Sequence, residues 1–221
     1  RLDASDAMAN AAVLNAVLAE VVHPDFPGVA PDRNRACTAR ARSFAILLDG
    51  RLSRVRFGAR SVCQLQLLKQ ISVAQPGFGP RGVAEVAAFV LGRRLHVPGQ
   101  AAVDVDVTRI VVPPFRFGDA TLTFASADLG PLADGELFIG TYHTHPEGDI
   151  TQGVLSETDL EYMQRGFVDF AGQIGTLGAD AGARSGRLDW LFDIVDPREG
   201  DWNVYAHDAV RLRELATLCT Q

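Results

Sequence analysis

The chain has 221 residues, of which 47% are apolar and 22% charged, and its formal net charge is −6 at pH 7. A soluble chain of this length and composition folds as one substantial domain, with at most a small appendage, and buries its core without disulfides. The acidic balance argues against a nucleic-acid-binding protein, which usually carries a basic stripe. The apolar stretches are too short to span a bilayer, so we expect no membrane partner.

The three cysteines are Cys37, Cys63 and Cys219. They are widely spaced and include no CxxC pair, which excludes a cysteine zinc knuckle and a thioredoxin-like redox site. An odd count without framework spacing is more typical of a reducing compartment than of a secreted protein. No signal peptide is visible, and we therefore expect a cytoplasmic protein.

Local patterns before residue 75 predict a helix, a β-hairpin and a second helix, over residues 3–22, 43–57 and 62–73. The hairpin turn is Asp49-Gly50, which is a strong short-range signal when it lies between two apolar runs. The segment 75–80 contains two prolines and two glycines and is the clearest break in the chain.

After this break, strands and helices alternate. Strands are predicted over residues 102–112, 138–145, 188–195 and 202–206, and helices over residues 156–167 and 208–218. The fold class is therefore α/β or α+β. We expect an N-terminal extension of helix, hairpin and helix at residues 1–79, packed on a core domain at residues 80–221.

Two histidines carry the clearest chemical signal. His143 and His145 are two residues apart on a predicted strand, so both imidazoles leave the same face, and Pro146 ends that strand. Ser156 and Asp159 are three residues apart at a predicted helix start, which puts both on one side of the helix. Two imidazoles and a carboxylate leave one position of a tetrahedral zinc open for water, as in catalytic zinc sites.

Glu85 is the candidate proton acceptor of such a site. It lies in the apolar segment 83–91, where an unpaired carboxylate is costly. A hydrolytic site needs a base that is not a ligand, to take a proton from water and deliver it to the leaving amine. An ion pair with Arg93 or Arg94 is the alternative explanation of Glu85. Ser156 fits two roles, a donor to the oxyanion of the tetrahedral intermediate and a plain helix N-cap.

Taken in order, these residues resemble the signature of the JAMM (MPN+) metalloproteases, a Glu followed by HxH-x7-SxxD. The flanking text is also similar. AEVAAFVLG at 84–92 resembles the Glu-bearing segment of the family, IGTYHTHP at 139–146 its histidine strand, and FDIVDP at 192–197 the strand and turn that follow. The resemblance covers roughly residues 80–207, and residues 1–79 match no family known to us.

The resemblance implies a curved mixed sheet between helices, with one zinc ion per chain held by His143, His145 and Asp159. It also implies that Glu85 is the general base and Ser156 the oxyanion helper. The implied reaction is cleavage of peptide or isopeptide bonds at the C-terminus of ubiquitin or a ubiquitin-like protein, in deconjugation or precursor maturation. In prokaryotes such proteins often work beside activating and conjugating enzymes, including in antiphage defence. The arginine-rich composition with a single lysine is consistent with a GC-rich bacterial genome.

The spacing departs from the family pattern in one place. Ten residues separate His145 from Ser156, where the family usually has seven, so we infer a three-residue insertion in the loop Glu147–Leu155. We expect this loop to contact substrate, and Asp149 within it is a fallback ligand.

Two other functions stay open: a RadC-like protein associated with DNA repair, suggested by the text HPEGD, and a non-catalytic MPN scaffold. The acidic charge argues against the first, and the complete ligand set argues against the second.

Overall fold

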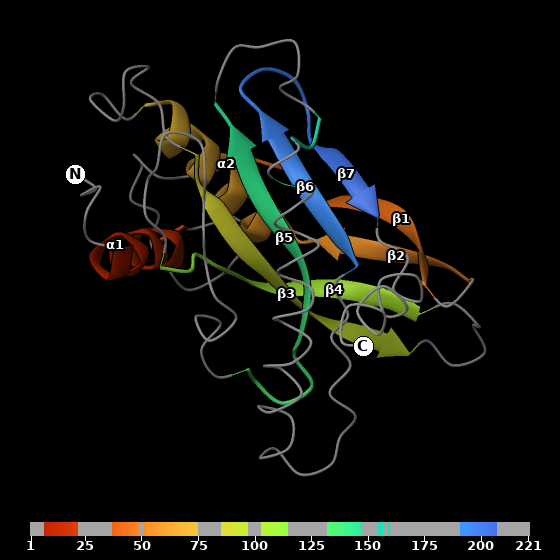
Figure 1. Cartoon of the computed structure of the whole chain (residues 1–221). Helices are drawn as coiled ribbons and strands as arrows, with labels where there is room; N and C mark the ends of the chain where they lie inside the picture. Colours follow the sequence, from red (N-terminus) through yellow and green to blue (C-terminus); the bar gives the residue numbers. More distant parts are fainter. Residues whose placement is uncertain are drawn as a thin grey trace, which may run out of the picture.

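The computed structural model describes residues 7–21, 37–48, 51–74, 85–96, 103–114, 132–146, 154–156, 159 and 191–206. In chain order the elements are α1 (Ala7–Ala19), β1 (Arg42–Leu48), β2 (Arg51–Phe57), α2 (Ala59–Val73), β3 (Ala87–His96), β4 (Val103–Val111), β5 (Leu137–His145), β6 (Phe192–Pro197) and β7 (Asn203–Ala206) (Figure 1). Within these residues, no helix is long and apolar enough to cross a membrane.

The strands form one seven-stranded sheet in the order β1-β2-β4-β3-β5-β6-β7. The pairs β2/β4 and β5/β6 are parallel, and all other neighbours are antiparallel. The sheet is therefore mixed, and the fold belongs to the α+β class, as the sequence predicts.

The local predictions are confirmed where they fall on described elements, whereas β3 was not predicted as a strand. α1 lies within the predicted first helix, α2 begins three residues before its predicted start, and β1 pairs with β2 as the predicted hairpin. Strands β4, β5 and β7 match their predicted ranges to within a residue, and β6 overlaps its range. The predicted helices over 156–167 and 208–218 fall almost wholly outside the described residues.

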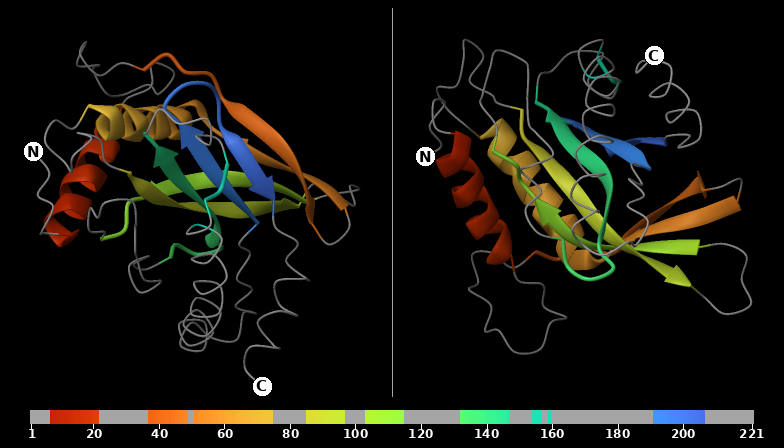
Figure 2. Two further views of the ribbon diagram at one scale, coloured as in Figure 1. Left: turned by 45° about the horizontal axis from the view of Figure 1, so that its top comes forward. Right: turned by 60° about the horizontal axis from the view of Figure 1, so that its bottom comes forward.

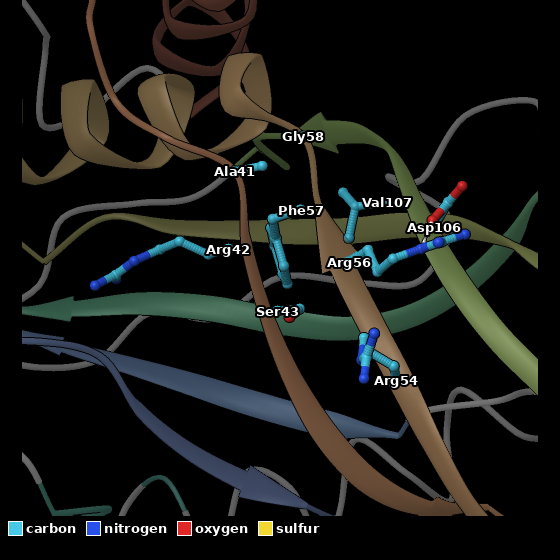
Figure 3. Close-up of a pocket in the computed structure, with 9 residues that line it drawn as sticks. All are labelled: Ala41, Arg42, Ser43, Arg54, Arg56, Phe57, Gly58, Asp106 and Val107. Carbon is cyan, nitrogen blue, oxygen red and sulfur yellow. Dashed lines mark hydrogen bonds and ion pairs between the residues drawn. The ribbon is translucent and has the colours of Figure 1, made fainter.

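The hairpin is joined to the later strands through β4. Val55 and Arg56 of β2 pair with Val105 and Asp106 of β4 in a parallel register. Arg56 Nε lies 2.6 Å from Asp106 Oδ1, and the close-up in Figure 3 draws this arginine extended toward Asp106. β1 and β2 thus share one sheet with the strands that follow residue 80, while the division of the chain at residue 79 remains a prediction.

Helix α2 packs against one face of this sheet, and α1 lies beside it (Figure 2). Leu65 and Leu68 of α2 are fully buried, as is expected from their helical spacing. Asn15 of α1 ties the helix to the end of β4, because its amide donates to Val112 O at 2.7 Å and accepts from Val112 N at 2.9 Å. The core therefore lies between the two helices and the sheet.

An ion pair with a buried carboxylate connects α2 to β6. Lys69 Nζ lies 2.8 Å from Asp196 Oδ1, and Asp196 is only 1% exposed. Tyr142 of β5 donates its hydroxyl to Asp196 Oδ2 at 2.8 Å and also lies 3.1 Å from Leu65 O. Burial, and then the negative charge of Asp196, raise the pKa of Tyr142 well above its ordinary value, so the phenol stays a donor.

The structure removes the argument for a reducing compartment that was drawn from the number and spacing of the cysteines. Cys37 and Cys63 form a disulfide, with their Cα atoms 5.8 Å apart and a sequence separation of 26. The bond ties the segment before β1 to the first turns of α2. The spacing gave no indication of it, because the β1–β2 hairpin folds back between the two cysteines and brings them together only in the tertiary structure. The cysteines therefore no longer favour a reducing compartment.

Candidate metal centre

The two histidines lie at the end of β5, between β3 and β6. The alternation of side chains along the strand puts both imidazoles on one face, and puts Tyr142 and Thr144 on the face toward α2. Gly140 allows β6 to lie close, since a Cβ there would be 2.6 Å from the carbonyl oxygen of Phe192. Backbone pairing with β3 and β6 on its two sides thus fixes the position of the β5 backbone at the two histidines.

His143, His145 and Asp159 meet at one point. The Nε2 atoms of the histidines are 3.0 Å apart. Asp159 Oδ1 is 3.6 Å from His143 Nε2, and Asp159 Oδ2 is 3.4 Å from His145 Nε2. Among the described residues, this is the group of His, Cys, Asp and Glu whose ligand atoms all lie within 4.8 Å of one another. Such a group can hold one metal ion.

The charges in this group are strongly coupled. Burial lowers the pKa of His143, but the hydrogen bond and charge of Asp159, and then the charges of Glu85 and Asp193, raise that pKa overall. Burial raises the pKa of Asp159, but the hydrogen bonds from His143 and His145 hold that pKa far below its ordinary value. The cluster therefore carries a carboxylate that attracts a cation, whether a proton or a metal ion.

Ser156 holds the carboxylate of Asp159 in place. Its backbone N–H and its hydroxyl both donate to Asp159 Oδ2, at 2.7 Å each, and the N–H of Asp159 donates back to Ser156 Oγ at 3.1 Å. These reciprocal bonds are those of a capping box at a helix start. Because both donors of Ser156 contact Asp159 here, the oxyanion role of Ser156 remains a prediction.

Glu85 lies just before β3, on the same face as the histidines. The register Ala87↔His143 continues through a hydrogen bond from Thr144 N to Val86 O, 3.0 Å long, so Glu85 comes opposite His145. β3 is extended, so Arg93 lies about 20 Å from Ala87 along the strand, beyond the reach of an ion pair with Glu85. The alternative explanation of Glu85 is therefore excluded for Arg93, and likewise for Arg94 beyond it.

One carboxylate near the histidines was missed from the sequence. Asp193 of β6 is 2% exposed, accepts a hydrogen bond from Thr141 Oγ1, and contributes to the raised pKa of His143. A carboxylate in an apolar segment was the signal that singled out Glu85, and the text LFDIV at 191–195 carries the same signal.

The predicted substrate loop, Glu147–Leu155, is described only at its end, where Val154 is exposed and Leu155 is half-buried. Asp149, the fallback ligand, lies outside the described residues. Comparison with known proteins gives no family, since no protein-family model matches the chain and no curated protein is significantly similar to it.

Proposed function

We propose that the chain is a zinc-dependent peptidase or isopeptidase that cleaves amide bonds at the C-terminus of a ubiquitin-like protein. One observation carries the proposal: three metal-ligating groups converge, and a carboxylate that is not one of them, Glu85, lies on the same face of the sheet. Hydrolytic zinc sites need this combination of three ligands, an open position and a separate base.

The donor set fits zinc. Four ligands placed tetrahedrally about 2.0–2.1 Å from zinc lie roughly 3.3 Å from one another. The Nε2 atoms of His143 and His145 are 3.0 Å apart, and the Asp159 carboxylate lies 3.6 Å from the first through Oδ1 and 3.4 Å from the second through Oδ2, so all three groups are within range of one ion. Two imidazoles and one carboxylate are also the ligand types of catalytic zinc hydrolases. A bound zinc ion would polarise the substrate carbonyl and lower the pKa of water at the fourth position.

Glu85 and Ser156 have separate roles in the proposed reaction. Glu85 would accept the proton of the attacking water and return it to the leaving amine. Ser156 would hold Asp159 through the capping box and would give a hydrogen bond to the oxyanion once its hydroxyl turns away from the carboxylate.

The substrate class follows from the resemblance of the motif and its flanking text to the JAMM metalloproteases. We propose a bacterial ubiquitin-like pathway with its own activating and conjugating enzymes as the setting, antiphage defence included, and the cytoplasm as the place, which rests on this setting and not on the cysteines. The DNA-repair and scaffold functions have no observation in their favour beyond the sequence text.

The test is hydrolysis of a ubiquitin-like protein fused at its C-terminus to a fluorescent reporter. We expect the zinc-loaded chain to release the reporter, and E85Q to lower kcat by about 100-fold or more, since a general base contributes on the order of 10²–10⁴. E199Q, at an exposed carboxylate, is the matched control. Equal rates for E85Q and the wild type would remove Glu85 from the reaction. Failure of the zinc-loaded wild type on every fusion of a ubiquitin-like panel would overturn the proposed substrate class.

A further inference from the structure

We infer that Thr144, held by Ser72 of helix α2, is a positioning residue that fixes Glu85 beside the metal centre. The inference rests on the proposed function, because it assigns Glu85 a place in the reaction. It concerns Thr144 and Ser72, which are neither metal ligands nor the proposed base.

Thr144 lies between the two ligand histidines, and its side chain points to the opposite face of β5, toward α2. It makes two bonds with Val86, the residue after Glu85. Its backbone N–H donates to Val86 O at 3.0 Å, and its hydroxyl oxygen accepts from Val86 N at 3.0 Å. A side-chain oxygen thus takes the place that a backbone carbonyl normally has in an antiparallel pair.

This contact is what fixes the backbone at Glu85. β3 begins at Ala87, so Glu85 and Val86 precede the regular ladder. The two bonds of Thr144 extend the register by one residue and thereby direct the Glu85 side chain to the face of His143. Displacement of a catalytic group by about 1 Å costs on the order of 100-fold in rate, so a small shift of this backbone has a large effect.

Ser72 completes the arrangement from α2. Its hydroxyl oxygen lies 2.7 Å from Thr144 Oγ1, and the two side chains are 0% and 1% exposed. The buried hydroxyl of Thr144 is satisfied by these protein groups, so its rotamer is held by Ser72 and Val86 together. Helix α2, which lies within the first 79 residues, therefore helps to position Glu85 at the metal centre.

The test uses four variants of the full chain. T144V keeps the shape of the side chain and removes the hydroxyl, T144S restores the hydroxyl, and S72A removes its partner. Y142F is the matched control, since Tyr142 is equally buried on the same face of β5 and its hydroxyl bonds to Asp196, whereas that of Thr144 bonds to Val86.

Three quantities are measured for each variant: zinc affinity by chelator competition, amide hydrogen exchange at Val86, and hydrolysis of the ubiquitin-like reporter fusion. For T144V we expect Val86 exchange to speed up about tenfold, because the Val86 N–H loses its acceptor. We expect kcat to fall at least about tenfold with KM little changed, and zinc affinity to stay within about threefold. T144S should restore the exchange and kcat, S72A should shift both in the same direction as T144V, and Y142F should leave Val86 exchange as in the wild type.

A double-mutant cycle separates positioning from general damage. In the E85Q background, T144V should lower kcat no further, because the group that it positions is already absent. The inference is overturned if T144V keeps wild-type exchange at Val86, if it costs as much in E85Q as in the wild type, or if it loses zinc in parallel with activity. If T144V does not fold, S72A decides by the same three readouts. If the wild type hydrolyses no fusion, the proposed function fails. If amide exchange at Val86 is nevertheless faster in T144V and S72A and unchanged in Y142F, the positioning of the Glu85 backbone by Thr144 stands.

Discussion

Lys69 Nζ lies 2.8 Å from Asp196 Oδ1, and the two side chains differ in exposure, at 22% and 1%. Removal of the lysine leaves a buried carboxylate that keeps the hydrogen bond from Tyr142 but loses its counter-charge, whereas removal of the carboxylate leaves an ammonium that can turn to water. We therefore predict that K69M destabilises the fold by about 3 kcal/mol and D196N by clearly less. Urea unfolding of both variants checks the order, and an equal or reversed loss would contradict it.

The Cys37–Cys63 bond closes a loop of 26 residues between the segment before β1 and α2. A cross-link of this span stabilises a fold by about 3 kcal/mol, chiefly by restricting the unfolded chain. We predict that reductant lowers the unfolding midpoint of the oxidised wild type and leaves that of C37S unchanged.

C219S is the matched control for the cysteine variant and should respond to reductant as the wild type does. A midpoint of the wild type that is insensitive to reductant, with the bond intact beforehand by mass, would contradict the stabilising role of the disulfide.

Glu136, at the start of β5, predicts a pH dependence. Burial raises its pKa, but hydrogen bonds from Ala133 N–H, Thr108 and Arg109 outweigh burial and lower the pKa below 4.5. A lowered folded-state pKa means that the carboxylate stabilises the fold fully above pH 4.5, the ordinary value, and that this stabilisation is lost as the pH falls through the folded-state pKa.

We therefore expect E136Q to be less stable than the wild type at neutral pH, by about 1–3 kcal/mol, with the difference shrinking in acid. Urea unfolding across this pH range measures it. E199Q, at an exposed carboxylate, is the control for the loss of one charge. A difference that grows in acid would show that the sign is wrong.

Ser156 should act on the metal through Asp159. S156A removes the hydroxyl bond to Asp159 Oδ2 and leaves the backbone N–H bond. Partners that orient a ligand typically change metal affinity by 10–100-fold, and we predict a loss of about tenfold, measured by chelator competition. S156T keeps the hydroxyl and should keep the affinity; a similar loss in S156T would assign the effect to packing.

Sequence patterns succeeded where the chemistry is local. The two-residue spacing of His143 and His145 requires only strand alternation to put both rings on one face, and Asp49-Gly50 requires only turn preferences to predict the hairpin. The spacing of Ser156 and Asp159 likewise predicted a capping arrangement, because its bonds lie within one helical turn.

The same patterns could not predict contacts between residues that are far apart in the sequence. Cys63 meets Cys37, and Ser72 meets Thr144, only once α2 packs on the sheet. The parallel pairing of β2 with β4 depends on how the chain crosses between them, which alternation along either strand does not determine. Asp193 did carry a local signal, a carboxylate inside the apolar text LFDIV.

The most direct measurement is the metal content of the purified chain. The account predicts one zinc ion per chain in the wild type, and little or none in H143A, H145A and D159N, since each removes one of three converging donors. The control is D106N, which changes a β4 carboxylate that pairs with Arg56 of β2. This variant should keep its zinc. Full zinc occupancy in D159N, or a wild-type chain that binds no divalent metal under zinc saturation, would contradict the central claim.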